Sequence, residues 1–294
     1  MGYLYLAIAM LAGAGKGYCA KKTSGLISGF RGATLSNLIR LGFCIPIGLL
    51  VVILSGDLGA MGQTGSFLWI SALSGVSTAV LVFTWLVAVR KNAYMLMDVF
   101  YTLAVLIPLC LSALFFDEGI KLTQWVGILI LVVAVLLLCS YNNSIKEKLT
   151  PGRILLLIIS GISNGMVDFS QKLFVKTTPH VPVSVFNFYT YLFGFITLVL
   201  FFLLTRSDEK LEVKTFRKIV GYIAVMAICL FAYSFFKTQA AGLLDSVLLY
   251  PLSQGGGMII ATTMAAVFFG EKVTPRCAIG VAIAFVGLII INLL

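Results

Sequence analysis

The chain has 294 residues, of which 60% are hydrophobic and only 11% are charged, and its net charge is +10. An ordinary soluble domain carries roughly 25% charged residues, so this composition excludes a soluble globular enzyme. Intrinsic disorder is excluded as well, because it requires low hydrophobicity and high charge. A polytopic membrane protein remains, provided that the apolar residues form runs of about 20, the length that crosses the hydrocarbon core of a bilayer.

Apolar runs of this length follow one another along the whole chain. The first half contains the segments 3–20, 32–54, 66–89, 93–116 and 124–141, and the second half contains 154–175, 182–204, 217–238, 244–269 and 277–293. These segments lack the alternation of apolar and polar residues that is typical of membrane β-strands. The sequence therefore predicts an all-α polytopic membrane protein with ten transmembrane helices.

The basic residues are distributed unevenly between the connections that join these segments. Fifteen Lys and Arg residues fall in the odd-numbered connections, whereas four fall in the even-numbered connections or their margins, namely Lys121, Lys172, Lys176 and Lys237. Because basic residues favour cytoplasmic loops, we expect the odd-numbered connections in the cytoplasm and both termini outside the cell membrane. The positive charge is thus a signal of membrane topology, and no nucleic-acid partner is expected.

A repeated motif divides the chain into two halves. Phe115-Phe116-Asp117-Glu118 corresponds to Phe268-Phe269-Gly270-Glu271 at an offset of 153 residues, and Gly127 and Gly280 follow at equal distances. The pattern predicts a first repeat over 1–145 and a second over 146–294, each with five helices. Because five is odd, the second repeat is inverted in the membrane. Inverted repeats commonly support alternating access to a substrate site near the bilayer midplane.

Two inverted five-helix halves, each ending with an acidic turn and a glycine-containing helix, resemble the drug/metabolite transporter superfamily, and its ten-helix EamA-like branch in particular. The stretch from Ser253-Gln254-Gly255-Gly256-Gly257 through Phe268-Phe269-Gly270-Glu271 to Leu294 also resembles the last helices of small multidrug resistance transporters. Those transporters exchange protons for cations through a glutamate midway along helix 1, and Gly13 stands near the matching position. The resemblance therefore does not imply that exchange. It implies a central cavity lined by the first, third, fourth, sixth, eighth and ninth helices.

Polar residues inside the predicted helices are the candidates for substrate binding. An ionisable side chain in the bilayer costs at least about 2.5–3.5 kcal/mol, so it should face a cavity or a partner. Tyr94, Asp98 and Tyr101 share one helix face, and Asn164, Asp168 and Gln171 repeat that spacing in the sixth segment. The candidate site comprises Lys16, Tyr94, Asp98, Tyr101, Asn164, Asp168, Tyr233, Tyr250, Ser253 and Gln254.

Structural interpretations compete with these assignments. Asp98 could pair with Lys16 or Arg40 and hold helices together, and Lys172, one turn from Asp168, could pair with that carboxylate. Glu118 and Glu271 are expected to stabilise turns, and the run of three glycines at 255–257 is expected to permit close helix packing.

These patterns favour a secondary active transporter of a small organic metabolite or amphipathic compound. Carboxylates among aromatic rings favour a cationic or zwitterionic substrate, with Asp98 as the first candidate for charge recognition and protons as a candidate coupling ion. Lys16 and Arg40 favour an organic anion instead, and a lipid flippase of the same fold is a further alternative. The single histidine and the cysteine spacing provide no catalytic triad or metal site, so neither an enzyme nor a cofactor is expected. The expected partners are the substrate and the bilayer, and the sequence leaves both a monomer and a dimer open.

Overall fold

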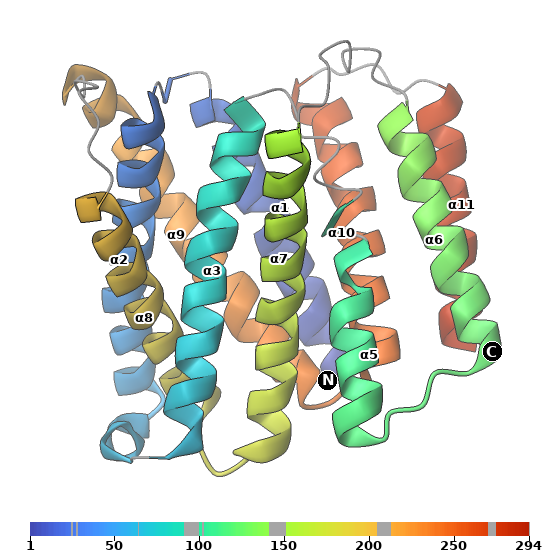
Figure 1. Ribbon diagram of the computed structural model, residues 1–294, viewed down its shortest axis with the longest axis horizontal. Helices are drawn as coiled ribbons and strands as arrows, with labels where there is room; N and C mark the ends of the chain where they lie inside the picture. The colour runs from blue at the N-terminus through green and yellow to red at the C-terminus, as the bar shows by residue number, and fades with distance from the viewer. Residues whose placement is uncertain are drawn as a thin grey trace.

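The computed structural model describes residues 1–24, 26–27, 29–63, 65–90, 100–101, 103–140, 151–204, 213–269 and 275–293. Over this part the chain is helical (Figure 1). The helices are α1 (Gly2–Ser24), α2 (Gly29–Leu54), α3 (Ser66–Arg90), α5 (Leu106–Phe116), α6 (Leu122–Ser140), α7 (Pro151–Thr177), α8 (Val183–Leu204), α9 (Val213–Ala241), α10 (Ser246–Phe269) and α11 (Pro275–Leu293). A short 3-10 helix, η1 (Asp57–Gly62), connects α2 to α3.

The predicted segments correspond to observed helices, with one difference in the fourth. There the prediction was a continuous helix over 93–116, whereas the observed helix α5 begins at Leu106, after a turn at Val105, and residues 91–99 lie outside the described part. Pro108 provides a reason, because it has no backbone N–H to bond to the carbonyl of Ala104. Local sequence also sets other boundaries: α7 and α11 both begin at a proline, which is preferred in the first helical position.

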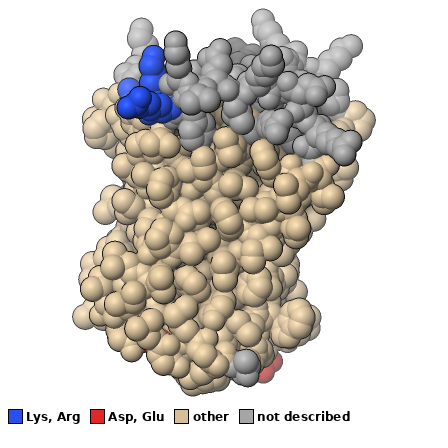
Figure 2. All heavy atoms as spheres, turned by 90° about the vertical axis from the view of Figure 1, so that its left-hand side faces the viewer, with Lys and Arg blue, Asp and Glu red and all other residues tan. Residues whose placement is uncertain are grey.

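The surface of the helical bundle carries many exposed apolar side chains. Large hydrophobic side chains such as Trp69, Leu114 and Leu203 are at least 70% exposed. Figure 2 shows one face with Lys and Arg at one end, Asp and Glu at the other, and a belt without charges between them. Five described helical stretches are long and apolar enough to cross a membrane: 32–54, 66–84, 154–177, 183–204 and 217–241. These observations are consistent with a polytopic membrane protein.

The helices of the two halves of the sequence pack against each other. The most extensive contacts join α1 to α9, α6 to α11, α3 to α7, α3 to α8 and α2 to α8. Further contacts join α2 to α9, α1 to α10 and α5 to α7. In Figure 1 the pair α6 and α11 lies at one side of the bundle, and both termini are in its lower half.

Glycines allow several of these helices to approach closely. A Cβ atom on Gly75 of α3 would lie 2.5 Å from the carbonyl oxygen of Thr190 and 2.8 Å from the nitrogen of Gly194, both in α8. Likewise, a Cβ atom on Gly127 of α6 would lie 2.9 Å from the carbonyl oxygen of Gly287 in α11. Small residues at such crossings are typical of helix packing in membranes, where backbones make direct van der Waals contact.

The glycine run in α10 is also used for packing, in part. A Cβ atom on Gly255 would lie 3.0 Å from a methyl group of Leu131, and one on Gly256 would lie 2.5 Å from the sulfur of Met10. Gly257, in contrast, has no neighbour within 4 Å of a Cβ atom built on it. Two of the three glycines therefore bring α10 close to α6 and α1.

Candidate functional site

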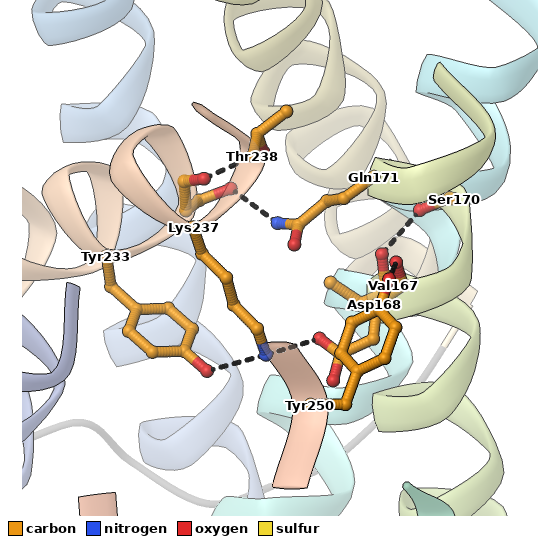
Figure 3. Close-up of polar contacts among 9 residues, drawn as sticks. Val167, Asp168, Ser170, Gln171, Tyr233, Lys237, Thr238 and Tyr250 are labelled. Carbon is orange, nitrogen blue, oxygen red and sulfur yellow. Dashed lines mark hydrogen bonds and ion pairs between the residues drawn. The ribbon is translucent and has the colours of Figure 1, made fainter. Parts of the chain in front are cut away.

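An ion pair between α7 and α9 is the centre of the candidate site. The ammonium of Lys237 donates to a carboxylate oxygen of Asp168 at 2.7 Å, and the two residues are only 3% and 5% exposed. Figure 3 shows the lysine side chain extending from α9 toward the carboxylate on α7. Burying two charges is expensive, and the cost is offset only when they are paired and further hydrogen-bonded.

Two tyrosines supply those further hydrogen bonds. The hydroxyl of Tyr233, one turn before Lys237 in α9, accepts a hydrogen bond from the lysine at 3.0 Å. The hydroxyl of Tyr250 in α10 donates to the backbone carbonyl of Asp168 at 2.8 Å. In Figure 3 both rings stand beside the ion pair. Three helices, α7, α9 and α10, therefore position this polar cluster.

Lys16 brings α1 into the same cluster. Its ammonium lies 4.8 Å from the centroid of the Tyr233 ring, which is a favourable distance for a cation over an aromatic face. Close packing of α1 on α9 makes this possible, since a Cβ atom on Gly15 would lie 3.0 Å from the sulfur of Cys229. The site thus combines side chains from the first and second halves of the sequence.

Beside the ion pair, a chain of amide and hydroxyl groups links α7, α9 and α8. Gln171 donates from its amide nitrogen to the hydroxyl of Ser234 at 3.2 Å, and that hydroxyl donates to the side-chain oxygen of Asn187 at 2.7 Å. All three side chains are buried. The side-chain oxygen of Gln171 is buried and has no hydrogen-bond partner, so the network contains one unsatisfied acceptor.

The structure brings four of the ten predicted site residues together: Lys16, Asp168, Tyr233 and Tyr250. Tyr101 instead forms a hydrogen bond of 3.0 Å with Ser160, and Asn164 is half-buried in α7. Ser253 is buried in α10. Tyr94 and Asp98, as well as the predicted turn residue Glu271, lie outside the described residues.

Gln254 lies in a different place from the ion pair. It borders an apolar crevice between α5, α6 and α10 that is lined by Val105, Ile128, Leu131, Val132, Pro251, Gln254 and Gly255. None of the charged residues of the candidate site is among them. The candidate site is therefore described around the buried charges, where groups that can recognise a polar ligand converge.

Two lysines have roles that differ from the sequence-based interpretation. Lys172 does not pair with Asp168, although it follows one turn later. It contacts Glu118 at 2.9 Å and donates to the carbonyl of Leu244 at 2.8 Å. Lys237, which the distribution of basic residues assigns to a loop margin and which is not among the predicted site residues, is the partner of Asp168. Its place on the same α9 stripe as Tyr233 was the signal that could have identified it.

Glu118 joins three elements at one end of the bundle. It lies in the connection between α5 and α6, contacts Lys172 and Lys176 of α7 at 2.9 and 3.0 Å, and accepts a hydrogen bond from the backbone nitrogen of Ser246 at the start of α10. Burial disfavours ionisation, but the interactions with Lys172, Ser246 and Lys176 outweigh it and lower the pKa of Glu118 to about 2. The carboxylate is therefore charged throughout the physiological pH range.

Within the described residues, no group of three His, Cys, Asp or Glu side chains is arranged to hold a metal ion. The side chains that converge at this site offer charge, hydrogen bonding and aromatic contact for recognition of a ligand.

Comparisons with known proteins agree with this architecture. Residues 152–293 match the model of the EamA-like transporter family. A solved structure titled "Crystal structure of protein" is similar over 99% of this chain and 96% of its own, with a TM-score of 0.74 and 17% sequence identity, which shows a shared fold. A search of curated proteins returned no match. The predicted resemblance to the EamA-like transporter family is therefore confirmed by the match over residues 152–293.

Proposed function

We propose that this protein is a secondary transporter that moves a small organic molecule by alternating access, and that the Asp168–Lys237 pair lies at its substrate site. The pair itself carries this proposal. Ionisable groups inside membrane helices are expensive, so they are a strong indication of a substrate or ion pathway. Here they are surrounded by hydroxyl groups and by a further cation, Lys16, which give a polar ligand several points of recognition.

The pattern of helix contacts supports two inverted repeats, over 1–145 and 146–294. If α1, α2, α3, α5 and α6 are matched with α7, α8, α9, α10 and α11, each of the eight most extensive contacts has a counterpart among them. The contact of α1 with α9 corresponds to that of α7 with α3, and the contact of α1 with α10 corresponds to that of α7 with α5. The contacts of α2 with α8 and of α6 with α11 map onto themselves. Such a twofold relation is what inverted-repeat transporters use to open to either side.

In this proposal the two halves rock against each other around the site. The Glu118 cluster closes one end, because Lys172 lies one turn beyond Asp168 on the same face of α7. While Glu118 connects α7 to the start of α10, the route from the ion pair to that end of the bundle is held shut. Opening to that side requires these contacts to separate.

Transport can be measured with purified protein in liposomes. We expect at least one of four radiolabelled solutes, namely succinate, glycerol 3-phosphate, glycine and choline, to enter faster than into protein-free liposomes. Asp168→Asn should reduce that uptake by roughly tenfold or more, because it leaves Lys237 without its counter-ion.

Asp117→Asn is the matched control. It makes the same chemical change at an exposed position with φ of 54°, a conformation that asparagine also tolerates, so uptake should be unchanged. Entry of all four solutes at the protein-free rate, or equal uptake by wild type and Asp168→Asn, would contradict the proposal.

A further inference from the structure

The charges inside the helices do not balance. Of the eleven acidic residues in the sequence, only Asp98 and Asp168 fall well inside the predicted segments, where Lys16 and Arg40 also lie. Lys237 is a third buried cation, since it is 3% exposed and paired with Asp168 although it is near the end of its segment. Asp98 lies outside the described residues, and even if it is counted in full, three cations face two carboxylates. Within the described interior, the only carboxylate that neutralises any of the three is Asp168, through Lys237.

Arg40 is buried without a partner in the described part of the structure. It is 4% exposed, and its Nε atom has no hydrogen-bond acceptor. Its electrostatic neighbours include the neutral groups Cys44, Tyr191 and Tyr101 and the cation Lys16. A guanidinium stays protonated in proteins and presents five donors in a planar fork that matches the two oxygens of a carboxylate or phosphate.

Lys16 has a surplus of donors as well. Its contact with the Tyr233 ring satisfies part of its charge but offers no oxygen acceptor. Lys16 lies within electrostatic reach of Arg40 and Lys237, which repel it, and of Asp168, whose charge is already paired with Lys237. An anion placed among these cations would remove that repulsion.

Tyr233 can complete such a site. Its hydroxyl accepts a hydrogen bond from Lys237, so its own proton is available for donation to a ligand oxygen. Tyr233 also lies between the two lysines, with Lys16 at 4.8 Å and Lys237 at 5.2 Å from its ring centroid. Lys16, the Nε atom of Arg40 and the Tyr233 hydroxyl thus offer donors for which the described contacts give no oxygen acceptor, and an oxyanion would supply one.

We propose, on the basis of the transport function above, that the substrate is a small organic anion whose carboxylate or phosphate group binds between Lys16 of α1 and Arg40 of α2, beside Tyr233. This reverses the preference for a cation that the carboxylates suggested in the sequence. Asp168 neutralises Lys237, and no carboxylate among the described residues neutralises Lys16 or Arg40.

Binding of defined solutes to the purified full-length protein tests this assignment. Succinate and glycerol 3-phosphate represent the carboxylate and the phosphate, and choline represents the cation, all at matched ionic strength. Because a ligand of the native state stabilises it, we expect at least one of the two anions to raise the unfolding temperature in a saturable way and choline to leave it unchanged. The responding anion identifies the oxyanion group.

Arg40→Gln should weaken binding of that anion roughly tenfold or more, because it removes a charged hydrogen-bonding partner. Arg217→Gln makes the same change at the exposed start of α9 and should bind as the wild type does. Lys16→Gln is the second site variant, since Lys16 is half-buried and its loss leaves the Asp168–Lys237 pair in place.

A measurement that needs no substrate complements these variants. In a protein that retains Cys229 alone among its cysteines, we expect an anionic methanethiosulfonate to react faster than a cationic one of matched size, and Lys16→Gln to reduce the ratio of the two rates. Cys229 is half-buried and lies within electrostatic reach of Lys16. An unchanged ratio would contradict the positive potential that the proposed site requires.

The outcomes separate this assignment from the transport function. Three results would overturn the anion site: stabilisation by choline alone, stabilisation by none of the solutes, or an anion that binds to Arg40→Gln and Lys16→Gln as tightly as to the wild type. If choline is the stabilising solute and is also taken up by proteoliposomes, the transport function stands although the anion site is wrong. If an anion binds in an Arg40-dependent way and never enters proteoliposomes, the anion site stands and the transport function falls.

Discussion

At the scale of single residues, the candidate site depends on an ion pair whose members come from different helices. Asp168 and Lys237 are 69 positions apart in the sequence, and each is almost fully buried. Removing one partner leaves the other as an uncompensated buried charge, which typically costs about 3–5 kcal/mol. The pair therefore constrains both helices to a fixed register around the site.

A double-mutant cycle measures this coupling. Asp168→Asn and Lys237→Met should each lower the unfolding temperature of the purified protein, and the double variant should be more stable than the sum of the two losses predicts. The physical reason is that the second change removes the charge that the first left unpaired. Additive losses would show that the two side chains do not interact.

Some residues of this site could be predicted from the sequence, and others could not. The sequence identifies four of them, because a polar residue inside an apolar segment can be recognised without knowing its neighbours in the fold: Lys16, Asp168, Tyr233 and Tyr250. Lys237 was not included, because four residues before the end of α9 its position resembles that of a lysine in a loop margin. Its burial is decided by the packing of α9 against α7, a long-range contact that no local pattern contains.

At the scale of elements, the connection between α5 and α6 acts through Glu118. Because the folded protein lowers the pKa of this carboxylate to about 2 from an ordinary value of 4.5, its interactions stabilise the fold fully above about pH 4.5. That contribution is lost as the pH falls toward 2, where the folded protein also protonates the group.

The pH dependence of Glu118→Gln tests this account. At pH 7 the variant should unfold at a lower temperature than the wild type, since it loses charged interactions with Lys172 and Lys176. The difference should shrink as the pH falls from 4.5 to 2.5, because the wild type loses the same interactions by protonation. Asp117→Asn, next to it, should show no such trend. A difference that stays constant with pH would contradict the role given to the Glu118 charge.

Helix packing at the crossing of α3 and α8 gives a second test at this scale. Gly75→Ala would place a Cβ atom 2.5 Å from the backbone oxygen of Thr190, so the two helices would have to move apart. We expect a loss of about 1–3 kcal/mol, measured by thermal or denaturant unfolding. Gly221→Ala in α9 is the matched control, because no atom lies within 4 Å of a Cβ atom there, and it should be neutral or stabilising. Equal effects of the two changes would contradict the close crossing.

At the scale of the whole molecule, the order and extent of most helices were predictable, because apolar runs are long and the breaks between them are polar or contain glycine or proline. The fourth segment shows the limit of this reasoning. Hydropathy does not register the turn at Val105, which reflects the lost hydrogen bond at Pro108. The pairing of helices was not predictable from apolar runs, since any apolar face can pack against any other. It depends on particular glycines, such as Gly75 and Gly194.

The twofold pattern of helix contacts and the site shared between α1, α7, α9 and α10 lead to one central expectation, that the site becomes accessible from each side of the membrane in turn. Cys229 reports on this, because its sulfur lies at the contact of α1 with α9, within electrostatic reach of Lys16. A protein that retains Cys229 alone among its six cysteines can be reconstituted into liposomes and treated with a membrane-impermeant maleimide from outside or from inside. We predict that Cys229 is labelled from either side, and that labelling from one side leaves no thiol to react from the other. Labelling from one side only would contradict alternating access.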